Sequence, residues 1–382
     1  MNGALGVLER IVRNADVVSD LASVRSFAAA RTLLAPAVRG FLLQKGKQGT
    51  SVEVPVDSTA VFNWSYGHDR AELEKLYRAG VTAQWDAATA LDWSTPVDPH
   101  DPGRELFLDS ALPLRELALY RGLPRKEQET QRAALLAWML SQFLHGEQGA
   151  LFAACQVTQS VSWFDGKLYG STQVIDEGRH CEVFHRYLDE KLGKSYEVND
   201  NLFVILDALM SDGRWDVKFL GMQVLVEGLA LGAFGALRQS TKEPLLSDLL
   251  TKVMLDEGRH VHFGVVALRE YYTGDLPEAD RREREDWTYE IAVLLRNRFL
   301  AHEFYEEYYA HAMTRRQWDA FILGSSYMET FRSRMFKRLV PNLKKIGLLT
   351  DRVRPHYERL GLLRWEGEKA APDLTEKDLL AD

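Results

Sequence analysis

Four long segments in the middle of the chain carry apolar residues at the spacing of one helix face. They cover residues of about 126–156, 160–191, 215–239 and 244–272. Within each segment apolar side chains recur every three or four residues, which is the period of a helix that buries one side. Four such helices can enclose a common core, so the pattern predicts an all-α fold built around a four-helix bundle.

The segments on either side of the bundle are predicted to surround it within one main domain. Residues 1–125 are interpreted as an N-terminal helical extension with loops that covers the bundle, and residues 126–340 as the bundle with its flanking helices. Residues 341–382 are interpreted as a C-terminal helix and a polar tail, with disorder expected beyond residue 364. An elaborated helical bundle can reach 382 residues without a second core.

Two stretches of the N-terminal extension carry local signals. Residues 69–85 have the pattern of a helix, while residues 50–56 alternate in polarity and are predicted to form a short strand or an extended arm. Prolines at positions 96, 99 and 102 then indicate a long loop before the bundle begins.

Four glutamates interrupt the apolar stripes of the predicted bundle. Each lies on the side of its helix that otherwise carries buried residues; they are Glu147, Glu177, Glu227 and Glu257. A carboxylate on a buried stripe is destabilising by several kcal/mol unless it meets a cation or takes up a proton. The four glutamates therefore need the same explanation, and a cation in the core provides one.

Two of these glutamates belong to a pentapeptide that occurs twice. The sequence Asp-Glu-Gly-Arg-His occupies residues 176–180 and returns at 256–260, and each copy's glutamate follows an earlier glutamate by thirty residues. Glutamate and histidine three positions apart lie on one face of a helix, so both can reach one metal ion. The repeat predicts a binuclear metal site whose ligands are Glu147, Glu177, His180, Glu227, Glu257 and His260.

The charges of these ligands match two divalent cations. Four ionised glutamates carry four negative charges and neutral imidazoles carry none, so two divalent ions neutralise the set. Ligation by many oxygen atoms together with imidazole nitrogen suits iron or manganese better than zinc, which favours fewer ligands in a tetrahedron. We therefore expect two iron ions, with manganese as the alternative metal in one or both positions.

The other residues of the two motifs are expected to support the ligands. A metal-bound imidazole usually donates its second N–H group to a carboxylate, and we predict that Asp176 and Asp256 each accept from the histidine of the opposite repeat. Arg179 and Arg259 would hold these aspartates ionised. The glycine in each motif is unfavourable within a helix by about 1 kcal/mol, and a close approach of two helices around the cluster would explain it.

A solvated helix face is the alternative interpretation of a Glu-x-x-His motif, because a single copy of so short a motif is common. The two identical pentapeptides, each preceded at equal distance by a glutamate on an apolar face, favour the metal site instead. His145, His185 and His262 lie outside this pattern and are interpreted as ordinary packing or surface histidines.

Composition limits the kinds of partner and the cellular compartment that the sequence predicts. A net charge of -8 and an isoelectric point near 5.8 give no basic surface for nucleic acid. The two cysteines, Cys155 and Cys181, lack metal-type or redox-type spacing, which fits a reducing cytoplasm. Charged residues interrupt the apolar pattern near the N-terminus, so no signal peptide is expected. The uncharged apolar run of residues 228–237 is too short to span a bilayer and indicates a buried helix rather than a membrane segment.

At the duplicated motif the sequence resembles the ferritin-like superfamily of carboxylate-bridged di-iron oxidoreductases. The Asp-Glu-x-Arg-His pattern is similar to that of the hydroxylase subunits of bacterial multicomponent monooxygenases, and similar motifs occur in benzoyl-CoA epoxidases and acyl-carrier-protein desaturases. The resemblance covers about residues 126–272. It implies a ferritin-like bundle, activation of O2 at two ferrous ions with electrons from a separate reductase or ferredoxin, and oxidation of a bound organic molecule.

At three positions the sequence differs from the motifs of these relatives, and each difference disfavours one of their functions. Phe184 stands where the radical-storing subunit of ribonucleotide reductase usually carries tyrosine, and Val253 stands where arylamine N-oxygenases add a third histidine. Monooxygenase hydroxylases and desaturases place a threonine one turn after the third glutamate, where this chain has Ala230 and Leu231. Radical storage and arylamine N-oxygenation are therefore disfavoured, and proton delivery is expected to differ.

The leading functional hypothesis is a non-haem di-iron, O2-dependent oxidase or oxygenase that acts on a small organic substrate. Glu177 and Glu257 are the bridging candidates, with Glu147 and Glu227 mainly terminal. The side of each helix that carries the ligands predicts which residues line a pocket beside the metals. They are Phe143, Gln173, Phe184, Gln223, Leu231 and Phe234. The alternatives are an iron-oxidising or iron-storing protein without an organic substrate, and a structural helical protein. Assembly as a homodimer is left open.

Overall fold

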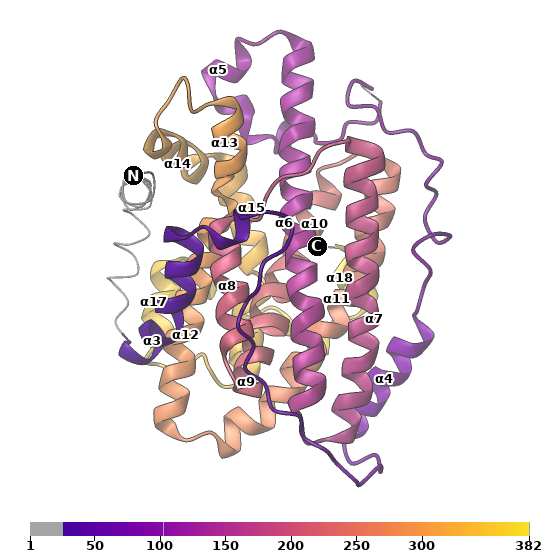
Figure 1. Ribbon diagram of the computed structural model, residues 1–382, viewed down its shortest axis with the longest axis vertical. Helices are drawn as coiled ribbons and strands as arrows, with labels where there is room; N and C mark the ends of the chain where they lie inside the picture. The colour runs from indigo at the N-terminus through magenta and orange to yellow at the C-terminus, as the bar shows by residue number, and fades with distance from the viewer. Residues whose placement is uncertain (1–25, 102, 382) are drawn as a thin grey trace.

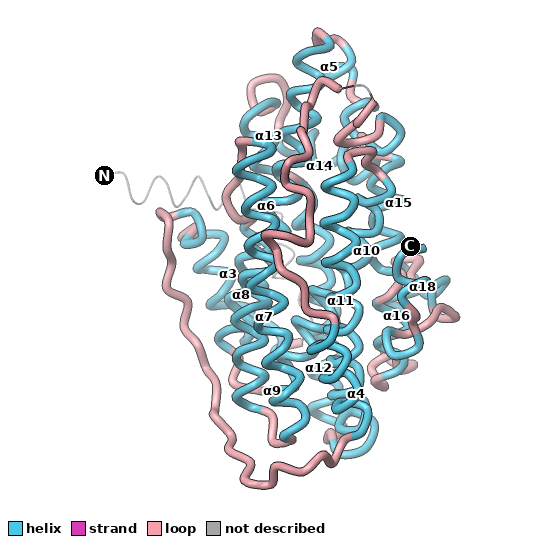
Figure 2. Tube along the Cα trace, turned by 90° about the vertical axis from the view of Figure 1, so that its right-hand side faces the viewer, coloured by secondary structure: helices cyan, strands magenta, loops and turns pink. Residues whose placement is uncertain are grey.

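Four long helices lie side by side at the centre of the molecule (Figure 1). The computed structural model describes residues 26–101 and 103–381, and within these ranges it contains helices and loops but no β strand (Figure 2). The predicted all-α class is confirmed. Residues 1–25, the start of the predicted N-terminal extension, lie outside the described residues.

The central helices coincide with the four segments predicted from the apolar pattern. They are α6 (Arg125–Ser160), α7 (Phe164–Arg186), α10 (Glu227–Gln239) and α11 (Pro244–Glu270). Helix α6 packs along α7 and α10 packs along α11, while α7 also contacts α11, so the two pairs share one core. The first two central helices belong to one repeat and the last two to the other.

The ends of these helices follow from their sequences. Helix α6 begins directly after Pro124 and ends where Val161 turns to an extended conformation. Pro244 occupies the first turn of α11, where its missing N–H group is not needed. The carboxylate of Glu243 caps that helix by accepting from the backbone N–H groups of Leu245 and Leu246, at 2.9 and 2.6 Å.

The third central helix is not regular throughout. It starts as α9 (Trp215–Phe219), continues as the π-helical segment η6 (Leu220–Val226) and becomes α10 at Glu227. A π-helical turn widens the helix and shifts the direction of the side chains that follow, and such segments are frequent at functional sites. One predicted metal ligand therefore lies at the point where this irregularity ends.

This third helix is buried within the protein. The run Trp215–Gln239 is the one helix among the described residues that is long and apolar enough to cross a membrane, and 89% of its most apolar 18-residue window is buried inside the molecule. The burial identifies it as a core helix, as the sequence predicted for residues 228–237.

The N-terminal extension covers one side of the core. It contains α3 (Phe27–Ala37), η1 (Val38–Leu42), η2 (Lys45–Lys47) and α4 (Ala71–Thr82), the last of which packs on α7 and α11. Residues 50–56 are an extended arm and not a strand. The residues that follow the arm make backbone hydrogen bonds to helix ends, such as Asp57 N–H to Met210 O at 3.1 Å and Val61 N–H to Gln159 O at 2.9 Å.

Shorter helices connect and surround the core. Those before the bundle are η3 (Asp109–Ala111), η4 (Pro113–Glu116) and α5 (Ala118–Arg121), and those between its two halves are η5 (Tyr187–Leu192) and α8 (Asp200–Ser211). Those after it are η7 (Tyr271–Asp275), α12 (Glu278–Asn297), η8 (Arg298–Leu300), α13 (His302–Tyr308), α14 (Arg315–Gly324), α15 (Ser326–Phe336), α16 (Leu339–Lys345), α17 (Arg354–Arg359) and η9 (Leu363–Trp365). The flanking helices predicted up to residue 340 are thus several, and most of them are short.

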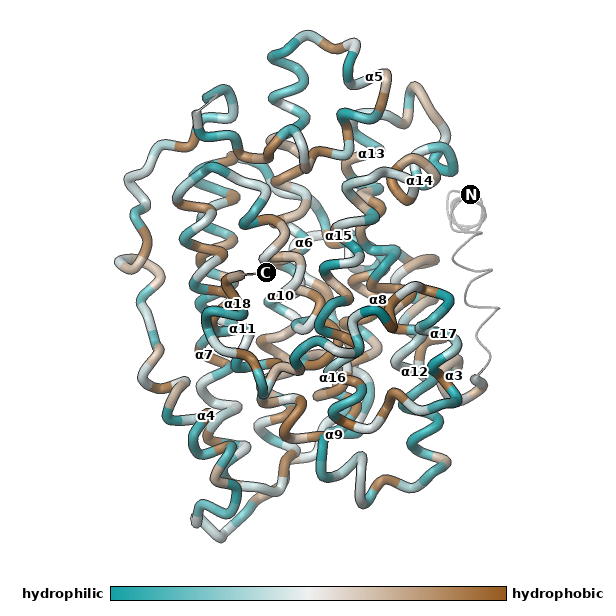
Figure 3. The backbone as a smooth tube through the Cα atoms, turned by 180° about the vertical axis from the view of Figure 1, so that it is seen from behind, coloured by the Kyte–Doolittle hydropathy of each residue, from teal (hydrophilic) through white to brown (hydrophobic). Residues whose placement is uncertain are grey.

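The expected disorder of the tail beyond residue 364 is wrong. The chain continues through η10 (Ala371–Asp373) to α18 (Glu376–Ala381), which packs on α10 and α11 (Figure 3). Leu379 is buried in that contact, and Arg238 donates to the backbone carbonyl of Leu380 at 3.1 Å. A few apolar positions within a polar segment are enough to attach it to the core, which average polarity does not reveal.

Candidate metal centre

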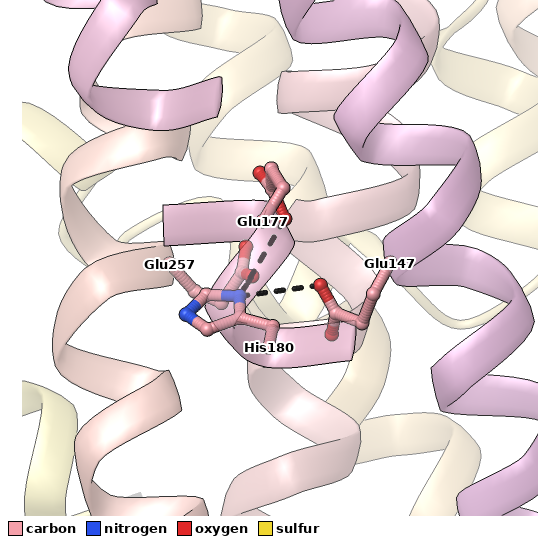
Figure 4. A group of neighbouring side chains, drawn as sticks. All are labelled: Glu147, Glu177, His180 and Glu257. Atoms are coloured by element: carbon pink, nitrogen blue, oxygen red, sulfur yellow. Dashed lines mark hydrogen bonds and ion pairs between the residues drawn. The ribbon is translucent and has the colours of Figure 1, made fainter. Parts of the chain in front are cut away.

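The structure brings all six predicted ligands together in the core of the bundle. Glu147 comes from α6, Glu177 and His180 from α7, Glu227 from the start of α10, and Glu257 and His260 from α11. None of the six residues is more than 5% exposed. Four side chains of the centre point toward one another in Figure 4, which labels Glu147, Glu177, His180 and Glu257.

The ligand atoms form two groups that share one glutamate. In each group the candidate atoms lie within 4.8 Å of one another: the first contains Glu147, Glu177, His180 and Glu257, and the second contains Glu177, Glu227 and His260. The rings of the two histidines are 5.9 Å apart between centroids. The arrangement is therefore able to hold a metal ion beside each imidazole.

Glu177 and Glu257 lie between the two histidines. Glu177 places Oε2 at 3.5 Å from Nδ1 of His180 and Oε1 at 3.1 Å from Nδ1 of His260. Glu257 does the same with Oε1 at 3.3 Å from His180 and Oε2 at 3.6 Å from His260. Glu147 faces His180 alone, at 3.3 Å. The two central glutamates thus have the positions that a bridging role requires.

The aspartates pair across the repeats, as predicted. Nε2 of His180 lies 3.2 Å from Oδ2 of Asp256, and Nε2 of His260 lies 3.1 Å from Oδ2 of Asp176. An N–H group at Nε2 of each ring then donates to the aspartate, so Nδ1 faces the glutamates and is the atom that would give up its proton to a metal ion. Each half of the molecule therefore fixes the ring orientation of the other half's histidine.

The arginines hold the aspartates in place, with help from residues that the sequence did not indicate. Arg179 donates to Oδ1 of Asp176 at 2.5 Å and to Oδ2 of Asp256 at 3.0 Å, and Arg259 donates to Asp256. Two side chains from the loop after α4 complete this network. They are Gln84, which donates to Asp176 at 2.8 Å, and Trp85, which donates to Asp256 at 2.8 Å.

Gln173 and Gln223 are predicted pocket residues, but in the structure they lie outside the cavity. Nε2 of Gln173 donates to Oε1 of both Glu177 and Glu227, at 3.0 Å each, and Gln223 donates to Gln173 at 3.4 Å. Both glutamines are fully buried. They orient the glutamates from one side of the centre, and neither lines the cavity beside it.

Several ligand atoms have no hydrogen-bond partner among the described residues. These buried atoms are Oε2 of Glu177, Oε2 of Glu227, both carboxylate oxygens of Glu257 and Nδ1 of His260. Buried polar atoms are nearly always paired, because an unpaired one costs about 1–3 kcal/mol. Unsatisfied lone pairs that converge in the core fit a bound cation, so the residues present are able to hold a metal ion.

The pKa values of the candidate ligands shift in both directions, because the two histidines outweigh burial at Glu177 and lower the pKa of that carboxyl. Burial, followed by neighbouring carboxylates, raises the pKa of Glu147 and of Glu227 well above the ordinary value. Burial lowers the pKa of each histidine, but the carboxylates around His180 and His260 outweigh it and raise their pKa values. Without a cation the cluster therefore retains protons, and these are the protons that a divalent ion displaces.

A small cavity of about 20 Å³ lies next to the glutamates. Its wall combines ligands, apolar residues and one arginine, namely Phe143, Gly146, Glu147, Ala150, Val226, Glu227, Ala230, Phe234, Glu257 and Arg298. Of the predicted pocket residues, Phe143 and Phe234 line it, with ring centroids 4.7 Å apart, and Phe184 packs against both.

The prediction that Leu231 lines the pocket is not supported. Leu231 is buried but lies outside the lining, and Ala230 takes the place expected for it. On a helix that presents Glu227, positions three and seven residues later share one side, and position 231 falls just beyond the edge of that side. Arg298 was missed because it comes from a short segment far along the chain, with no helical phase that relates it to the motifs.

The two motif glycines differ in their surroundings. A Cβ atom on Gly258 would lie 2.4 Å from Leu379 of α18, so close packing explains this glycine. A Cβ atom on Gly178 would meet nothing within 4 Å. The predicted close approach is therefore present at one repeat and wrong for the other.

No family model matches the chain, and no curated protein matches it.

Proposed function

We propose that this protein is a non-haem di-iron, O2-dependent oxidase or oxygenase that acts on a small organic substrate. The observation that carries the proposal is the duplicated set of four buried glutamates and two histidines, in which unpaired ligand atoms converge and both imidazoles are held by aspartates. Bound iron would supply reversible one-electron chemistry to dioxygen, with electrons from a reductase or ferredoxin.

The protein's own residues orient the ligands and exclude water from one side of the centre. Asp176 and Asp256 hold the Nε2 protons, so that each imidazole keeps its Nδ1 lone pair directed to the centre. Gln173 fixes the direction of Glu177 and Glu227. The phenylalanines exclude water from one side, which prevents loss of reactive species to solvent. Ala230 lines the cavity, so this wall offers a methyl group and no hydroxyl for proton delivery.

Metal loading under anaerobic conditions tests the proposal. Purified protein should bind about two ferrous ions per chain, and the loaded protein should change its optical spectrum when it meets oxygen. A mass-spectrometric screen with isotopically labelled oxygen against aromatic, acyl-thioester and amino-acid pools then separates the reactions. Label in a product indicates an oxygenase, and oxidation without label indicates an oxidase or desaturase. Two bound irons with no optical change would contradict the proposal.

Iron oxidation without an organic substrate is the second candidate. The volume of the cavity favours it, because about 20 Å³ holds little more than one water molecule. An iron-storing protein would take up many ions per chain and form a large assembly. Iron content and particle mass, measured on the same loaded sample, distinguish the two functions.

A further inference from the structure

Arg298 is a buried cation beside the proposed metal centre. It lies in η8 between α12 and α13, is 4% exposed and contributes to the cavity wall together with Glu147, Glu227 and Glu257. The rest of the wall is apolar apart from these glutamates. Arg298 therefore lines the same cavity as three of the four predicted glutamate ligands.

No described residue forms a hydrogen bond or an ion pair with Arg298. Its Nε atom is buried without a partner, its side chain lies over the ring of its neighbour Phe299 at 4.8 Å, and the carboxylate of Glu147 attracts it without a hydrogen bond. The other buried arginines among the described residues have hydrogen-bond or ion-pair partners. Arg179 binds Asp176 and Asp256, and Arg284 binds Asp216 at 2.9 Å. A buried charge without a partner is strongly destabilising, so a folded protein retains one where a ligand completes it.

The charges around the centre leave this arginine uncompensated once metal is present. The four glutamates and the two aspartates of the motifs carry six negative charges. The motif arginines and two divalent ions balance them, and neutral imidazoles add nothing. Within the part of the chain that the structure describes around this centre, Arg298 is then one positive charge in excess. Burial lowers its pKa to about 10, which still leaves the group charged at neutral pH.

We propose that Arg298 binds the carboxylate of a monoanionic, apolar substrate at the metal centre; this inference rests on the proposed function. One negative charge closes the count, which favours a carboxylate over a phosphate dianion. The planar guanidinium group matches a carboxylate with two parallel hydrogen bonds. The apolar part of the substrate meets the side chains of Ala150, Val226 and Ala230. Because the cavity is small, Phe143 and Phe234 must move to admit it.

Calorimetric titration of the iron-loaded protein, kept anaerobic, tests this assignment. The probes are acetate, which needs little room, and hexanoate, each beside its neutral amide, with hexylphosphonate as a dianion. The proteins are wild type, Arg298→Gln, Arg298→Lys and the control Arg296→Gln, which removes a charge two residues away outside the cavity. Iron content is measured on every sample before titration.

Wild type should bind the carboxylates more tightly than the amides, and Arg298→Gln should weaken carboxylate binding by roughly 10- to 100-fold. Arg298→Lys should retain part of the preference, and Arg296→Gln should retain all of it. A carboxylate that binds through the metal alone keeps its affinity in Arg298→Gln, and this result would overturn the assignment. Equal binding of acid and amide by wild type, or tighter binding of the phosphonate, would also overturn it.

If wild type binds no iron, the proposed function itself fails before any titration. If iron binds normally and Arg298→Gln keeps full carboxylate affinity, only the role of Arg298 fails. Should Arg298→Gln not fold, the comparison of acids with amides in wild type and in Arg298→Lys still decides the question.

Discussion

The two halves of the bundle carry the same pentapeptide but differ in what surrounds it. In the first half α6 and α7 are regular around the motif, and Gly178 faces open space. In the second half a π-helical segment precedes Glu227, and α18 covers Gly258. The comparison shows that the repeat determines the ligand geometry, while the rest of the chain determines what each half contacts.

The halves are nevertheless coupled through the centre. The Asp256 carboxylate that supports His180 belongs to the other repeat, and the reverse holds for Asp176 and His260. Each half therefore depends on the other to orient its histidine. Substitutions can separate effects that reach both halves from effects that stay within one.

Removal of a shared glutamate should have the largest effect. Glu177 belongs to both ligand groups, whereas Glu147 belongs to one. Glu177→Ala is expected to abolish metal binding at both positions, and Glu147→Ala to remove about one of two ions per chain. Elemental analysis after anaerobic loading measures both. Glu182→Ala, an exposed glutamate on the same helix, is the control and should bind metal normally. Full metal content in Glu177→Ala would show that the halves do not share this ligand.

Loss of one aspartate should have the next largest effect, and it should appear in the opposite half. Asp256→Asn is expected to weaken the position beside His180 by roughly 10- to 100-fold, the usual effect of removing a residue that orients a ligand. Cobalt titration followed by optical spectroscopy resolves the two positions. Asp176→Asn should weaken the position beside His260. If each substitution instead weakens the position beside its own repeat's histidine, the cross-pairing has no energetic role.

Stability of the metal-free protein should fall as pH rises above the ordinary pKa of glutamate, about 4.3. The pKa values of Glu147, Glu227, His180 and His260 are raised in the folded state. A group whose pKa is raised in the folded state stabilises the fold at pH values below its unfolded pKa, which is near 4.3 for glutamate and 6.5 for histidine. This stabilisation is lost as the pH rises through the pKa of the folded state. Metal-loaded protein lacks these protons and should not show the decline. Unfolding midpoints of both forms over a pH series measure the difference, and parallel curves would contradict the prediction.

The sequence predicted the ligands because helical spacing relates residues within one turn and the repeat relates the two halves. Glu177 and His180 are three positions apart on a single helix, and no long-range packing is needed to place them together. Trp85 and Arg298 reach the same centre from a loop and a short helix. Their places depend on how distant segments pack, and no local pattern carries that information.

The smallest predicted effect uses the glycines, where the two halves differ most directly. Both lie within helices, where alanine is intrinsically more favourable than glycine by about 1 kcal/mol. Gly178→Ala meets no neighbour within 4 Å and should raise the free energy of unfolding by about 0.5–1 kcal/mol. Gly258→Ala would press on Leu379 and should gain less or lose stability.

Chemical denaturation of the metal-free variants measures both changes, and metal content checks that the centre is intact. Leu379→Ala should be destabilising alone, because its side chain is buried, but should relieve the crowding caused by Gly258→Ala. The double variant is therefore expected to be more stable than the sum of the two single effects. Additive effects, or equal gains in the free energy of unfolding at both glycines, would mean that α18 moves away at no energetic cost. The difference between the halves would then have no energetic consequence at this contact.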